Sequence, residues 1–280
     1  MKTYRSMRAL FAAAISAAAL TAGSFLVGTA VSAVAGGCSP ALSLVLSVLL
    51  RCAALAVLYP VCVLLFRLLC GRYPSLSQSG TESGKSEETG EDEDKNETEK
   101  PNPKESAPNN DSDRLGARPI PYPEDEGKAA LSGIPLFLSM LLGFVLILGV
   151  SAALSYAFRR LGIPTASSGQ VIFPDGMAPA AAVCFAFLGH VLLPALTEEY
   201  FYRGAILPGL LSAGCGGRLS VCVSAVLFSA AHSSPAQMLT AFAAGLILGE
   251  LGRRSRSFLP TAAVHLTYNA VVLFLAVIAY

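Results

Sequence analysis

Charged residues are scarce in this sequence: Asp, Glu, Lys and Arg make up 14% of its 280 residues, whereas hydrophobic residues make up 53%. Together with a mean hydropathy of +0.56, this balance excludes an ordinary soluble globular domain and makes the bilayer the expected solvent. Acidic residues are almost confined to one segment, because 15 of the 19 lie between Glu82 and Glu126. A carboxylate at the centre of a membrane helix costs about 2.5 kcal/mol or more, so acidic residues elsewhere are candidates for function. These are Asp175, Glu198, Glu199 and Glu250.

The sequence also lacks the usual patterns of cysteine chemistry. None of its seven cysteines forms a CxxC pair, and all lie scattered in apolar runs. We interpret them as small apolar side chains rather than as metal ligands or disulfide partners.

Long apolar runs predict an all-α fold, a multi-pass transmembrane helical bundle of about seven helices. Each run approaches or crosses the ~30 Å hydrocarbon core, and the fifth and sixth are short, as expected for helices packed around a polar cavity. The first run exceeds the roughly 7 to 15 apolar residues of a signal peptide, so a retained helix is favoured over a cleaved one. The runs are residues 9–35, 41–69, 129–158, 177–200, 219–231, 236–251 and 258–280.

One segment, residues 71–128, has the opposite character. It is rich in Glu, Asp, Pro, Asn and Ser and shows no apolar periodicity. We therefore expect a disordered acidic linker, and a solvated linker is favoured over an acidic docking tail. The chain is thus divided into two N-terminal helices (1–70), the linker (71–128) and a C-terminal helical core (129–280).

Basic residues beside the apolar runs predict the orientation in the cell membrane. The positive-inside rule places the N-terminus, the acidic linker, Arg218 and the basic cluster at 253–256 on the cytoplasmic side. The C-terminus is then outside. Arg159 and Arg160 do not fit this arrangement, because they fall on the outer side.

The strongest local pattern is TEEYFYR, residues 197–203, at the end of the fourth apolar run. On a helix, Glu199 and Arg203 share one face, where an ion pair can offset the burial of both charges. Glu198 points about 100° away from Glu199, so its carboxylate is left free. A free carboxylate in a poorly solvated site suits a general base near neutral pH. The alternative interpretation is an interfacial charge cluster that marks the end of a helix.

Two later helices add polar residues at membrane depth. The sequence FSAAH ends in His232, and HLTYN places His265 and Asn269 on one helical face. There the imidazole and the amide can both hydrogen-bond one oxygen. A lone histidine in an apolar helix is usually a packing residue, but polar residues on three separate membrane helices indicate a site. They converge if the bundle encloses one water-filled cavity.

In this order, the motifs resemble the CPBP family, which includes CAAX prenyl proteases and bacteriocin-processing proteins and is also called Abi. Gly245 and Gly249 in the sixth run also fit that family, and small residues four apart let helices approach closely. The resemblance covers about residues 133–280. The residues that match the pattern are Glu198, Glu199 and Arg203, then Phe228 and His232, then His265 and Asn269.

The resemblance implies an intramembrane endopeptidase. Glu198 would activate a water with help from His232, while His265 and Asn269 would stabilise the oxyanion of the tetrahedral intermediate. One such oxyanion donor can contribute about 3 to 4 kcal/mol. The structural support of this site would be Glu199, Arg203, Phe228, Gly245 and Gly249.

This interpretation requires no cofactor, but zinc is an alternative. Two histidines and a glutamate can ligate Zn²⁺ with one open position. Against zinc, the sequence has no HExxH motif, and Glu198 as a ligand would leave the site without its base. His190 lies about 12 Å from Glu198 along the helix and is interpreted as a packing or cavity-lining residue. Asp175 is expected in a turn, and Glu250 at a helix end.

The expected partners are a peptide or membrane-protein substrate and the lipid bilayer, with no nucleic acid. The cavity is expected to face the cytosol, and a CAAX substrate does not follow from the sequence. Two other classes of function stay open. One is a non-catalytic immunity or scaffold protein that keeps the polar cluster for binding. The other is a proton-relaying transporter, for which the expected internal repeats are not convincing.

Overall fold

The computed structural model describes residues 2–70, 120–123, 129–163 and 176–278. Within these residues every regular element is a helix, so the predicted all-α class is confirmed. Five helices are long and apolar enough to cross a membrane: α1, α2, α3, the rod Pro179–Ser212, and α9. The predicted multi-pass bundle is therefore confirmed as well.

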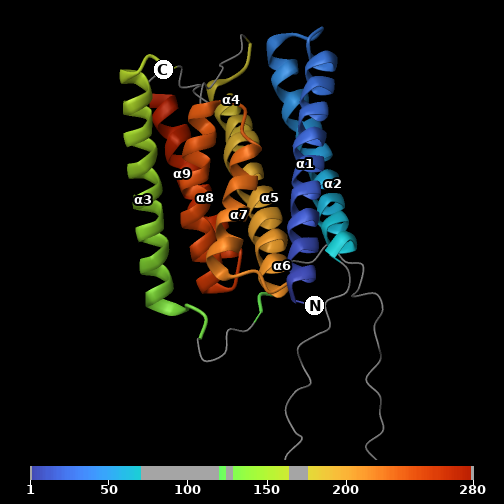
Figure 1. Cartoon of the computed structure of the whole chain (residues 1–280). Coiled ribbons are helices and arrows are strands. Elements are labelled where there is room, and N and C mark those ends of the chain that lie inside the picture. The colour runs from blue at the N-terminus through green and yellow to red at the C-terminus, as the bar shows by residue number, and fades with distance from the viewer. Residues whose placement is uncertain (1, 71–119, 124–128, 164–175, 279–280) are drawn as a thin grey trace, which may run out of the picture. The chain divides into compact units, whose positions relative to one another are not determined.

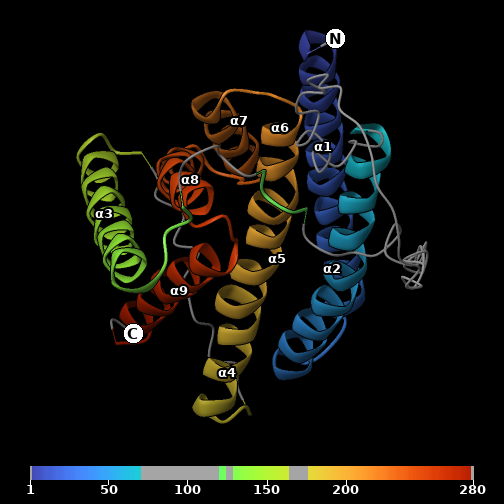
Figure 2. The same cartoon turned by 90° about the horizontal axis from the view of Figure 1, so that it is seen from below.

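The first two helices, α1 (Lys2–Ala35) and α2 (Pro40–Cys70), lie side by side as a hairpin (Figures 1 and 2). α2 also packs on the rod that carries TEEYFYR, where the ring of Tyr59 meets the ring of Phe201 edge-on at 6.0 Å between centroids. The hairpin thus covers one flank of that rod.

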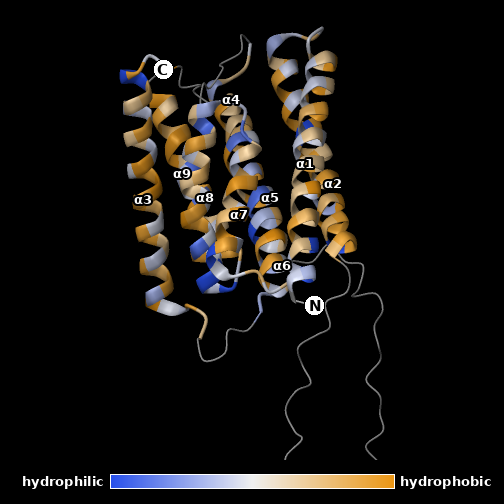
Figure 3. Ribbon diagram, in the orientation of Figure 1, coloured by the Kyte–Doolittle hydropathy of each residue, from blue (hydrophilic) through white to orange (hydrophobic). Residues whose placement is uncertain are grey.

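The rod itself corrects one prediction. The fourth run does not end near residue 200 but continues as helix to Ser212, so TEEYFYR lies inside a membrane-spanning rod. The charged motif can lie inside a helix because Glu199 and Arg203 neutralise each other within the protein, at 2.7 Å and with both side chains 0% exposed. In Figure 3 the rod is correspondingly polar part-way along its length. Its parts are α4 (Pro179–Ala186), η2 (Phe187–Leu192), α5 (Leu193–Phe201), η3 (Tyr202–Ile206) and α6 (Leu207–Ser212).

Two wide π-helical turns, η2 and η3, interrupt this rod shortly before Pro194 and Pro208. Proline has no N–H to donate, and it disturbs the helical hydrogen bonding around it. After η3, the N–H of Leu207 donates five residues back to the carbonyl of Tyr202. Carbonyl groups near Pro208 therefore need donors from outside the rod.

The hairpin of α7 (Gly217–Ala230) and α8 (Pro235–Ser255) confirms the predicted close packing of small residues. A Cβ atom added at Gly245 would lie 3.0 Å from Ala225 Cα, and one at Gly249 would lie 3.0 Å from a methyl group of Val221. α7 has 14 residues, so it spans only about 21 Å. α7 is therefore too short to cross the ~30 Å hydrocarbon core by itself.

The last part of the bundle is formed by α3 (Gly133–Arg160) and α9 (Leu259–Ile278), which pack on each other and on α8. The hydroxyl of Tyr268 on α9 donates to the hydroxyl of Ser151 on α3 at 3.0 Å. Apolar side chains from α3, α8 and α9 form a core around this contact: Ile147, Leu248, Leu251 and Val264.

Most of the predicted linker lies outside the described residues, as does Asp175. Residues 120–123 are described, and they differ from the prediction of disorder because they bind the core. The N–H of Ile120 donates to the carbonyl of Gly204 at 2.7 Å, and the hydroxyl of Tyr122 donates to the carbonyl of Arg203 at 2.7 Å. These bonds supply the donors that the rod lacks near Pro208.

Candidate active site

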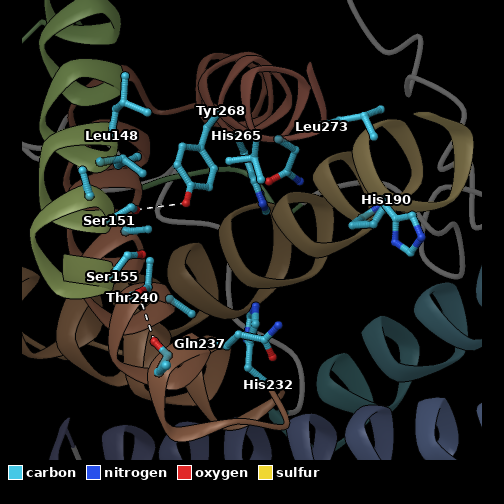
Figure 4. Close-up of a pocket in the computed structure, with 18 of the residues that line it drawn as sticks. Leu148, Ser151, Ser155, His190, His232, Gln237, Thr240, His265, Tyr268 and Leu273 are labelled. Atoms are coloured by element: carbon cyan, nitrogen blue, oxygen red, sulfur yellow. Dashed lines mark hydrogen bonds between the residues drawn. The ribbon is translucent and has the colours of Figure 1, made fainter. Parts of the chain in front are cut away.

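A cavity of about 650 Å³ lies between α3, the rod, the α7–α8 hairpin and α9. Glu198, His232, His265 and Asn269 all line it. In Figure 4, His232 and His265 extend toward the same space from opposite walls. The three polar motifs therefore meet at one cavity, as the catalytic interpretation of the sequence requires.

The two adjacent glutamates have opposite surroundings. Glu199 is 0% exposed, and its Oε1 accepts a hydrogen bond from Nη1 of Arg203 at 2.7 Å. Glu198 is half-buried in the wall of the cavity. Among the residues that the structure describes, none forms a hydrogen bond or ion pair with the Glu198 carboxylate. The predicted ion pair of Glu199 and Arg203 is confirmed.

Glu199 has a second partner that the sequence did not indicate. Its Oε1 also accepts a hydrogen bond from Nδ1 of His265 at 3.0 Å. The two residues are 66 positions apart, so no helical spacing relates them. One buried carboxylate oxygen thus joins Arg203 to an imidazole in the cavity wall.

Arg203 and Phe228 tie these helices together. Nη2 of Arg203 donates to the carbonyl of Gly245 on α8 at 3.2 Å, and its Cζ lies 4.6 Å from the centre of the Phe228 ring. The same ring meets His232 and His265 edge-on, with centroids 5.2 Å and 5.9 Å apart. The phenylalanine of the FSAAH motif therefore separates and orients both histidines, while its face stabilises the buried guanidinium.

Hydrogen bonds at Nδ1 define the tautomer of both histidines. Nδ1 of His232 lies 3.1 Å from the carbonyl oxygen of Phe228, which can only accept, and Nδ1 of His265 faces the ionised Glu199. Each Nδ1 therefore carries a hydrogen, and Nε2 has the free lone pair in the neutral ring. A neutral His265 can only accept at Nε2. It donates there only when both ring nitrogens carry a hydrogen.

The cavity occupies one end of the bundle. Its lining residues come from the C-terminal halves of α3 and α9 and from the N-terminal part of α8, including Ser155, Arg159, Gln237 and Ala276. The basic cluster at 253–256 and the start of α7 lie at the opposite end (Figure 1). The cavity thus lies nearer the end of the bundle opposite the basic cluster, whereas the cytoplasmic linker and the cytosol-facing cavity both stay predictions.

Several cavity residues have no motif that predicts them. His190 was interpreted as a packing or cavity-lining residue, and it lines the cavity. The polar residues Ser151, Gln237, Thr240 and Tyr268 were missed, although they also line it. Single Ser, Thr, Gln and Tyr residues are common in membrane helices, so only the fold distinguishes them.

The placement of the side chains does not fit a zinc site. Within residues 2–70, 120–123, 129–163 and 176–278, no three His, Cys, Asp or Glu side chains are grouped closely enough to hold one metal ion. Glu198, His232 and His265 share the cavity without forming such a group. No catalytic step is therefore assigned to a metal.

Comparison with known families supports the same region. Residues 180–271 match the family model described as Rce1-like, type II CAAX prenyl endopeptidase. The CPBP resemblance is thereby confirmed. The match spans about a third of the chain and contains every motif residue of the CPBP-type core, whereas α1, α2, α3 and residues 120–123 lie outside it. No curated protein and no solved structure matches the chain.

Proposed function

We propose that this chain is an intramembrane endopeptidase in which Glu198 and His232 activate a water molecule. The CPBP-type match supports a protease in general. The observation that best supports the catalytic assignment is the contrast between two neighbours. Glu199 is held in a buried ion pair, whereas Glu198 lines the cavity with no partner among the described residues.

Glu198 and the Nε2 lone pair of His232 supply two acceptors for the hydrogens of one water. The water oxygen bonds to the carbonyl carbon of the scissile peptide, and a proton passes to Glu198. The C–N bond then breaks, and the leaving amine takes this proton, so that the site returns to its starting state.

The oxyanion formed in this step requires donors. The amide of Asn269 is one, and Nε2 of a doubly protonated His265 is the other. Glu199 accepts a hydrogen bond from Nδ1 on the opposite side of that ring and thereby holds its orientation. Preorganised donors of this kind are most effective where water is excluded.

The proposal is tested with Glu198→Gln, His232→Ala, His265→Ala and Asn269→Ala in purified protein in lipid nanodiscs. The probes are a farnesylated CAAX peptide and a non-prenylated, membrane-anchored peptide with a quenched fluorophore. Loss of Glu198 or His232 is expected to lower kcat at least about 10²-fold. Loss of Asn269 is expected to lower it about 10²- to 10³-fold.

Glu250→Gln is the matched control for the glutamate, because Glu250 pairs with Arg253 and Arg254 at 38% side-chain exposure and does not line the cavity. Surface pairs contribute little, so this variant should cleave like the wild type. Cleavage that survives in Glu198→Gln would reject the assignment. Cleavage lost on chelation and restored by Zn²⁺ would favour the zinc alternative. Cellular function retained by all four site variants would favour a scaffold.

A further inference from the structure

Tyr122 lies outside every motif and outside the family match, yet it binds the helical turn that contains Arg203. Its hydroxyl donates to the carbonyl of Arg203 at 2.7 Å. Two residues earlier, the N–H of Ile120 donates to the carbonyl of Gly204 at 2.7 Å. The C-terminal end of the acidic linker thus contacts two consecutive residues of the rod.

These two carbonyl groups are those that Pro208 and the π-helical turn deprive of their ordinary donors. In a regular α-helix, Leu207 would donate to Arg203, but its N–H donates to Tyr202 instead. Pro208 would donate to Gly204, but it has no N–H. A buried carbonyl without a donor costs roughly 1 to 3 kcal/mol, so the linker segment completes the hydrogen bonding of this turn.

The site that receives Tyr122 depends on a glycine. A Cβ atom added at Gly252 on α8 would lie 3.1 Å from the Tyr122 hydroxyl and 3.5 Å from Cγ of Arg203. Burial raises the pKa of Tyr122 above its ordinary value, so the hydroxyl stays protonated and can act as a donor at any physiological pH. Deprotonation of the hydroxyl therefore does not break this contact at physiological pH.

Arg203 links Tyr122 to the cavity, because Tyr122 binds its main-chain carbonyl while its guanidinium binds Glu199. Arg203 donates to Glu199, and the same oxygen of Glu199 accepts from His265. We propose that Tyr122 is a positioning residue: by fixing the backbone of Arg203 it fixes the Glu199 carboxylate and thereby the orientation of His265. The expected effect of Tyr122 on kcat rests on the proposed function. Its effect on the orientation of His265 does not, because that orientation can be measured separately.

The test is Tyr122→Phe in the full chain, with Tyr156→Phe as the matched control. Tyr156 is 61% exposed on α3 and does not line the cavity. Loss of one buried hydrogen bond is expected to lower kcat about five- to tenfold while KM changes less than about twofold. The control should leave both values unchanged.

The second measurement is nitrogen NMR of protein labelled at histidine. The chain has 3 histidines, so each ring can be assigned by substitution. Tyr122→Phe should shift the nitrogen signals of His265 and leave those of His190 in place. Gly252→Ala should have the same effect, and the double variant should be no worse than either single one, because both changes remove the same contact.

The outcomes separate the two proposals. If the wild type cleaves no peptide, the proposed function fails, but a shift of His265 in Tyr122→Phe still supports the positioning role. If Tyr122→Phe lowers only the melting temperature, with kcat and the His265 signals unchanged, Tyr122 is merely structural and the positioning proposal is overturned.

Discussion

At the scale of single residues, the most constrained group is the carboxylate of Glu199. It is 0% exposed and one of its oxygens accepts from both Arg203 and His265. Two buried charges contribute little net stability as a pair, because the desolvation of each offsets their attraction. We infer that this pair is retained for the geometry of His265 rather than for the stability of the bundle.

This inference predicts different effects on stability and on activity. Arg203→Met alone leaves the buried carboxylate of Glu199 without the cation that neutralises it and should lower the free energy of unfolding by about 3 to 5 kcal/mol. Glu199→Gln combined with Arg203→Met should recover most of that stability but not the activity, because His265 has lost its charged partner. Melting temperature in detergent and kcat in nanodiscs measure the two effects. Equal loss of stability in the single and double variants would contradict it.

Part of this site follows from sequence and part does not. The pair of Glu199 and Arg203 follows from a spacing of four residues, because helical geometry brings such positions together. The bond of Glu199 to His265 and that of Tyr122 to Arg203 join helices and segments far apart in the chain. The spacing of residues along the sequence therefore cannot predict such contacts.

At the scale of elements, the small residues of α8 determine how closely α7 approaches. Gly245 faces the backbone of Ala225, and its own carbonyl accepts from Arg203. The sequence predicted this approach from the spacing of Gly245 and Gly249. It did not predict the length of the rod. The polar sequence TEEYFYR is typical of a helix end, and it can lie within a helix only because its charged side chains have buried partners.

Gly245→Ala is expected to destabilise the protein by about 1 to 3 kcal/mol, because the added methyl group would overpack a rigid backbone. Gly149→Ala on α3 is the control, since a Cβ atom there meets nothing within 4 Å. The control should be neutral or slightly stabilising, because alanine favours helix over glycine. Thermal unfolding of both variants in the same detergent is the measurement. Equal melting temperatures would show that α7 and α8 separate without cost.

At the scale of the whole molecule, the distribution of charge relative to the cavity decides the side from which substrate enters. Arg5, Arg8, Arg218 and the cluster at 253–256 lie at the end of the bundle remote from the cavity, whereas Arg159 lines it. If the positive-inside rule holds, the basic end is cytoplasmic. We then expect the cavity to lie toward the outer side of the membrane and to accept a peptide from that side.

Thiol labelling of intact cells tests this orientation, in a background whose seven cysteines are replaced. Leu161→Cys marks the cavity end, just after α3, and Leu259→Cys marks the basic end, at the start of α9; their side chains are 72% and 63% exposed. An impermeant maleimide should label the first in intact cells and the second only after permeabilisation. The reverse pattern would place the cavity on the cytoplasmic side, because the two markers lie at opposite ends of the same bundle. If Leu161→Cys is labelled in intact cells, peptide added outside these cells should also be cleaved. If only Leu259→Cys is labelled, external peptide should stay intact.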